Sequence, residues 1–186
     1  DMAIYVDGSD EVHNALANLQ TTTLAASGNI TASSTSGSQP FINIENTNNG
    51  ATAGSLKFIN DRGAAGVDGD LSGTITFFAD DSDQNNQEFA RIEGKAVDAT
   101  AGSEEGGLDF YVAEVDGAVT KGMAIAGHAS GDGDVTVDIS THDGSSGGLK
   151  LGGTLVTSTA TELNLLDGQT ALFTTGKAIA MAIVFG

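Results

Sequence analysis

Apolar and polar side chains alternate along much of the middle of the chain. Val135, Val137 and Ile139 are separated by polar residues, a period of two that is typical of a strand with one face turned away from water. The same period occurs in the stretch 107–115, and similar stretches recur at short intervals. We expect strands at 41–45, 55–60, 72–79, 88–97, 107–115, 121–127, 134–140 and 148–153.

Clusters of Gly, Asn and Asp separate these stretches, as in NTNNGATAG (46–54) and HDGSSGG (142–148). These residue types tolerate the positive φ angles that tight turns require. The middle of the chain therefore predicts an all-β fold with short strands and long acidic turns.

Two short helices and two short strands are expected outside this region. Val12, Leu16 and Leu19 recur at helical spacing, which predicts a helix at 10–19. The sequence from Thr159 to Glu162 matches a capping box and predicts a helix at about 160–166. The start of the chain, 2–6, alternates enough to form a strand.

The last apolar run, 178–185, reads AIAMAIVF and is apolar on both faces of an expected strand. Such a strand is buried on both sides in a stable protein and aggregates when it is left free.

Three zones follow from these patterns. They are a connecting segment at 1–37, a β-rich module at 38–153, and a short helix with the apolar strand at 154–186.

The composition indicates that one copy has too few large apolar residues for a core of its own. Leu, Ile, Val and Phe make up 43 of 186 residues, close to the ~20% at which chains remain disordered. An intertwined trimer, resembling a β-prism or a β-sandwich, would supply the missing contacts. We expect inter-chain packing by Leu163, Leu166, Ile179, Met181, Ile183 and Phe185.

The formal net charge of −18 narrows the range of partners. A protein that binds nucleic acid through phosphates needs a basic surface, and anionic membranes repel an acidic chain. The longest apolar run, 178–185, is also far shorter than the ~20 residues of a membrane span. The chain has no Cys, which excludes disulfides and thiolate sites.

Carboxylates grouped in two turns make Ca²⁺ the one candidate cofactor. Asp80, Asp81 and Asp83 stand together in one turn, and Asp132 and Asp134 in another. Carboxylate oxygens are preferred Ca²⁺ ligands, but neither turn fits a full calcium-loop motif, and solvated acidic turns are the simpler interpretation. We expect no other cofactor.

Catalysis is not expected. A catalytic triad could be assembled from Ser145 as the nucleophile, His142 as the base and Asp143 as the acid. The members of such triads, however, usually meet through the fold rather than along the sequence. A polar turn is the simpler interpretation. Glycosidases use a pair of carboxylates, but acidic residues are so abundant in this chain that a matching pair carries no information. Sugar-binding clefts usually contain aromatic side chains, and the chain has no Trp and only two Tyr.

Several segments resemble tail-fibre proteins of tailed bacteriophages, notably marine ones. The segment LVTSTATELNLLDG (155–168) looks like an element that recurs in those fibres. The stretch 55–114, with its acidic DGD segment at 68–70, is similar to one of their β modules, and the ending KAIAMAIVFG is similar to a fibre C-terminus. No segment resembles their tail-docking domain, so we expect a distal piece. No segment resembles the self-cleaving C-terminal domain that many such fibres carry.

This resemblance implies a homotrimeric fibre or spike at the virion surface, outside the cell, with a role in attachment. The implied partners are other tail proteins and a glycan or protein of the host cell surface. Two other classes remain open. One is a capsid head fibre or decoration protein, and the other is a bacterial surface adhesin or filament.

Overall fold

The computed structural model describes residues 27–128 and 133–164. The chain divides between Leu56 and Lys57 into two units, which are taken separately below. The three sequence zones proposed above remain predictions.

The described part of the first unit, 27–56, contains neither helix nor strand. Its order comes from side-chain amides and carbonyls, since Asn46 Nδ2 donates to the Thr52 carbonyl at 3.0 Å and Asn46 Oδ1 accepts from Asn48 N–H at 2.9 Å. The predicted strand at 41–45 is wrong, and so is the one at 55–60. A strand needs a hydrogen-bonded neighbour, which apolar alternation alone does not supply.

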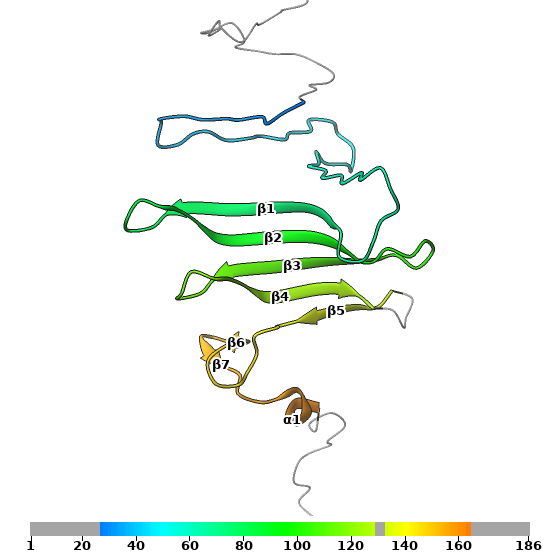
Figure 1. Cartoon of the computed structure of the whole chain (residues 1–186), viewed down its shortest axis with the longest axis vertical. Helices are drawn as coiled ribbons and strands as arrows, with labels where there is room; N and C mark the ends of the chain where they lie inside the picture. Colours follow the sequence, from blue (N-terminus) through cyan, green and yellow to red (C-terminus); the bar gives the residue numbers. More distant parts are fainter. Residues whose placement is uncertain (1–26, 129–132, 165–186) are drawn as a thin grey trace, which may run out of the picture. The chain divides into compact units, whose positions relative to one another are not determined.

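The second unit contains a five-stranded antiparallel sheet whose strands follow chain order, as Figure 1 shows. β1 to β4 are joined in sequence by hairpin connections, the simplest way to link antiparallel neighbours. The predicted all-β character is confirmed, and the sheet is open rather than a closed barrel. Its strands are β1 (Leu71–Asp80), β2 (Asn86–Asp98), β3 (Glu105–Ala113), β4 (Val119–Gly127) and β5 (Val135–Asp138).

Four irregularities interrupt the register of the sheet, and two of them decide the face on which a charged side chain lies. Phe77 pairs with Ala90 and Phe78 with Glu88, so that Phe89 in β2 is left without an opposite residue. In β4, Gly122 is unpaired in the same way between the partners of Phe110 and Tyr111. Such bulges change the face on which the following side chains lie.

A small hairpin and one helical turn follow the sheet. β6 (Lys150–Leu151) pairs with β7 (Thr154–Leu155), and Gly152 and Gly153 between them take positive φ angles of 57° and 84°. α1 (Ala160–Asn164) begins with the predicted capping box. Thr159 N–H donates to Glu162 Oε2 at 2.8 Å, and Glu162 N–H donates to Thr159 Oγ1 at 3.2 Å.

The helix expected at about 160–166 is therefore confirmed as far as Asn164. The elements expected at 2–6, 10–19 and 178–185 lie outside the described residues. Within the described residues, no helix has the length and hydropathy to cross a membrane.

Candidate functional site

One face of the sheet is almost entirely apolar. The register places aliphatic and aromatic side chains opposite one another across all five strands, as in the row from Leu108 through Ile125 to Val137. We call this side the apolar face. It is made by Ile75, Phe77, Ala90, Ile92, Leu108, Phe110, Val112, Met123, Ile125, Val135 and Val137.

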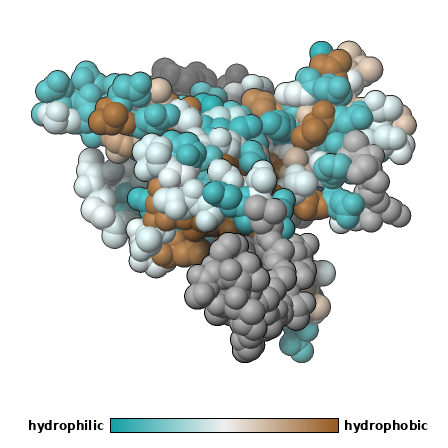
Figure 2. All heavy atoms as spheres, turned by 90° about the horizontal axis from the view of Figure 1, so that it is seen from below, coloured by the Kyte–Doolittle hydropathy of each residue, from teal (hydrophilic) through white to brown (hydrophobic). Residues whose placement is uncertain are grey.

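The described part of the chain leaves most of the apolar face uncovered. Phe77 is 50% exposed, Val112 58% and Val137 63%, and no hydrophobic side chain among the described residues is fully buried. Figure 2, which views the molecule from below, shows hydrophobic groups in brown at the surface among polar residues. The strands contact one another, while α1 and the β6–β7 hairpin make no contact with them.

The segment before β1 covers one corner of the apolar face. A Cβ atom added at Gly73 would lie 2.5 Å from the Cβ of Phe58, so the ring of Phe58 packs directly on the glycine backbone. Asn60 Nδ2 donates to the Leu71 carbonyl at 2.8 Å and holds the segment in place. Phe58 itself stays 48% exposed and therefore extends the apolar surface rather than closing it.

The opposite side, which we call the charged face, is centred on Asp109. This residue is 1% exposed and is the one fully buried polar side chain among the described residues. Its Oδ2 lies 2.5 Å from Lys95 Nζ and 3.5 Å from Lys121 Nζ, and it accepts a hydrogen bond from the Tyr111 hydroxyl at 3.3 Å. Burial alone would raise the pKa of Asp109, but Lys95, with help from Lys121, holds that pKa below its ordinary value.

A second group of charges surrounds Arg91 on the same face. Arg91 Nη1 lies 3.0 Å from Glu88 Oε1, and Arg91 Nε lies 2.6 Å from Glu93 Oε1 in an ion pair that is not aligned as a hydrogen bond. The guanidinium carbon also lies 4.5 Å from the centre of the Tyr111 ring. Burial, together with Glu93 and Asp109, raises the pKa of Tyr111.

The two faces therefore differ in whether their side chains find interaction partners within the chain. Three basic and three acidic side chains of the charged face neutralise one another within the sheet, whereas the apolar face has no such partners. The three basic members are Arg91, Lys95 and Lys121, and the three acidic members are Glu88, Glu93 and Asp109.

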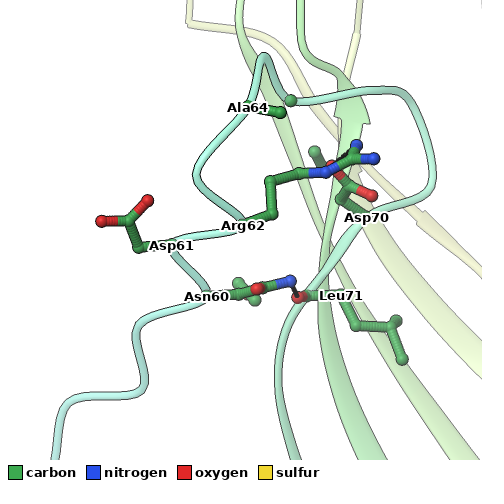
Figure 3. A pocket seen from close by; sticks show the side chains of 9 residues that line it. Asn60, Asp61, Arg62, Ala64, Asp70 and Leu71 are labelled. Carbon is green, nitrogen blue, oxygen red and sulfur yellow. Dashed lines mark hydrogen bonds and ion pairs between the residues drawn. The ribbon is translucent and has the colours of Figure 1, made fainter.

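A cavity of about 250 Å³ lies beside the start of β1 (Figure 3). Arg62 and Asp70 point toward each other across it, with Nη1 and Oδ2 2.8 Å apart, while Asp61 points away. Asp70 Oδ2 also accepts from Val67 N–H at 2.9 Å, and this bond, followed by Arg62, holds the pKa of Asp70 below its ordinary value. The polar groups of the cavity thus bond to one another and to the backbone of the loop that encloses it.

The residues predicted to bind Ca²⁺ do not gather into a ligand set where they are described. Asp80 and Asp83 are exposed, and Asp81 Oδ1 accepts from the N–H groups of Asp83 and Asn85 at 2.8 and 2.9 Å. Asp134 is exposed, and Asp132 lies outside the described residues. No group of three or more potential metal ligands is found in the described ranges. The Ca²⁺ hypothesis stays a prediction.

The loop at 141–149 uses its polar residues for its own architecture. Asp143 Oδ1 accepts from the N–H groups of Ser145, Ser146 and Gly147 at 2.8, 2.9 and 3.1 Å, and these bonds strongly lower the pKa of Asp143. His142 Nδ1 accepts from Leu149 N–H at 3.3 Å, and its Nε2 lies 3.3 Å from the Ser158 carbonyl. His142, Asp143 and Ser145 are thus joined to the backbone and not to one another as a triad.

Of the residues predicted to pack between chains, Leu163 lies in α1 and is 45% exposed. The other five lie outside the described residues, and the packing prediction stays open. They are Leu166, Ile179, Met181, Ile183 and Phe185.

The sequence did not indicate the two groups of charges. Lys95 and Asp109 stand 14 residues apart in different predicted strands, and no motif connects them. The alternation at 107–115 did place Asp109 opposite the apolar side chains of its own strand. The missing information was the register between strands, which is set by the fold as a whole.

Comparison with models of known protein families, with curated protein sequences and with solved structures found no match to this chain.

Proposed function

We propose that this chain is a structural segment of a bacteriophage tail fibre or spike that takes part in attachment to the host cell. The observation that carries the proposal is a five-stranded sheet without a single buried hydrophobic side chain among the described residues. A sheet of this kind gains its stability from assembly rather than from a core of its own. Fibre proteins, whose chains are stable only together, have this requirement.

The chemistry of the described residues supports a structural role. Carboxylates of its turns accept backbone N–H bonds at Asp68, Asp81, Asp98 and Asp143, and the six charges grouped around Asp109 and Arg91 pair with one another. The resemblance of 55–114 and 155–168 to tail-fibre elements supports a location of the assembly at the virion surface. A homotrimer is the expected state, with other tail proteins as neighbours along the fibre.

Attachment follows from many weak contacts rather than from one deep pocket. Three copies present each surface three times, and several fibres multiply that number again, so that weak contacts add through effective concentration. The net charge of −18 favours neutral or cationic groups of the host surface, such as uncharged glycans or basic protein patches.

Localisation on the virion tests this proposal. Antibodies raised against the recombinant chain, applied with gold labels to intact particles, should mark the tail fibres and should reduce adsorption to host cells. Labels on the capsid would instead assign the chain to a head fibre or decoration protein. Labels on bacterial cells without phage would assign it to a surface adhesin.

A further inference from the structure

We infer that the apolar face of the β1–β5 sheet is the surface through which copies of this chain assemble, each copy covering the face of its neighbours. The inference rests on the proposed function only for the number of copies, three. The sequence had placed inter-chain packing in the last residues of the chain. The sheet offers a second and larger surface.

The size of the apolar face fits an interface between copies. Four strands are paired over about eight residues and β5 over four; with a spacing of ~4.8 Å between strands and ~3.3 Å per residue, the projected area is on the order of 600 Å². Because side chains stand out from the sheet, the accessible area is larger than its projection. Stable interfaces bury about 800 Å² on each partner. A face of this size is therefore sufficient for a specific assembly.

The chain's own apolar run is too narrow to cover this face. The segment 178–185 would form one strand, and a single strand covers about one or two of the five strands in width. Exposed residues span the whole face, from Phe77 in β1 at 50% to Val135 in β5 at 64%. A second copy presents a surface of matching width.

Charge also favours an identical partner. The chain carries a formal charge of −18, so most encounters between copies are repulsive. The apolar face contributes no charge, and two such faces can meet without desolvating a carboxylate or an ammonium group. A charged partner would have to bury its charges against Ile92 and Phe110 without any counter-charge.

Two bulges of the sheet keep charges away from this face. In a regular β4, Lys121 would share a face with Met123, but the unpaired Gly122 sends Lys121 to the charged face beside Tyr111. In a regular β2, Glu88 would share a face with Ala90, but the bulge at Phe89 brings Glu88 to Arg91. Both irregularities have the same result, an apolar face that is free of charge.

Two neighbouring residues of β1 provide a matched test. Phe77 lies on the apolar face, and Thr76, which pairs with Arg91, lies on the charged face; both are exposed. Wild-type protein and Thr76→Asp should have the mass of three 18.7 kDa chains by light scattering. Phe77→Asp should raise the dissociation constant of the assembly at least roughly tenfold, as expected for burying an unpaired charge. Equal masses for the two variants would overturn the inference.

A labelling experiment keeps the inference testable if Phe77→Asp does not fold. The chain has no Cys, so Val112→Cys on the apolar face and Thr136→Cys on the charged face each introduce one thiol. A maleimide should react with Val112→Cys at least roughly tenfold more slowly in the assembly than after dilution to monomers, because the face is buried only between copies. Thr136→Cys should react equally fast in both states.

Two results would contradict the inference. Protection of the thiol in Val112→Cys that persists in the monomer would mean that the chain covers its own face. Fast reaction at every concentration would mean that no copy covers it. These outcomes are independent of the proposed function, since the apolar face can join copies on a tail, on a capsid or on a bacterial cell.

Discussion

At the scale of single residues, the best-enclosed side chain of the described residues is a carboxylate. Asp109 is held by Lys95, Lys121 and Tyr111 on a sheet that has no other layer over it. The side chains of Lys95 and Lys121 stay partly exposed, at 27% and 35%, while the carboxylate between them is buried. This group of side chains fixes the relative positions of β2, β3 and β4.

Replacing Asp109 by Asn should destabilise the folded state by about 1–3 kcal/mol, because Lys95 and Lys121 would then lie close together without a counter-charge. The partial exposure of both lysines keeps the effect below that of a fully buried pair. Urea unfolding at pH 7 measures it. Asp138→Asn is the control, since Asp138 is an exposed residue at the edge of the sheet and should change the free energy of unfolding by less than about 0.5 kcal/mol. Equal effects would contradict the role given to Asp109.

At the scale of elements, the hairpins depend on carboxylates in their turns and on bulges in their strands. Asp81, Asp98 and Asp116 each accept the backbone N–H two residues ahead, at 2.8, 2.7 and 3.0 Å, in the β1–β2, β2–β3 and β3–β4 turns. This pattern is the Asx turn, in which a side chain takes the place of a backbone acceptor. Bulges then decide on which face Glu88 and Lys121 lie.

The turn at Asp81 should respond to acid. Hydrogen bonds from Asn85, then Asp83, hold the pKa of Asp81 below its ordinary value of 3.8. A carboxylate with a lowered pKa in the folded state stabilises that state above its ordinary pKa, and this contribution is lost as pH falls through the lowered value. The Asp83 and Asn85 amide resonances should therefore shift together with a midpoint below 3.8.

Asp81→Asn provides the matched variant because Asn keeps an acceptor oxygen but cannot titrate. The melting temperature of the wild type should exceed that of Asp81→Asn at neutral pH, and the difference should shrink as the pH is lowered below about 4. A difference that stays constant down to pH ~2 would show that the Asp81 charge does not hold the turn.

At the scale of the whole molecule, stability has to come from contacts between copies. No hydrophobic side chain in the described ranges is buried within one chain, and a domain normally relies on such burial for most of its favourable free energy. Folding and assembly should then be one process.

The melting temperature of the protein should therefore rise with protein concentration, as mass action requires when the folded state is an oligomer. Differential scanning calorimetry over a hundredfold range of concentration measures this. A chain that is stable as a monomer would have the same melting temperature at every concentration. That result would contradict an assembly held together by contacts between copies.

The sequence by itself determined where most strands lie, which side chains share a strand face, and how α1 begins. Alternation at 72–79, 88–97, 107–115 and 121–127 predicted β1 to β4. The capping box from Thr159 to Glu162 predicted the start of α1. These features are local, because the period of side chains along a strand and the capping of a helix depend on residues only a few positions apart.

The tertiary structure alone decided the register of the sheet. It brought Lys95 and Lys121 to Asp109, placed the bulges at Phe89 and Gly122, and left 41–45 and 55–60 without strand partners. All of these depend on hydrogen bonds between segments far apart in the chain. A segment's own alternation says which face is apolar, while only its neighbours determine whether it becomes a strand and which charges meet across the sheet.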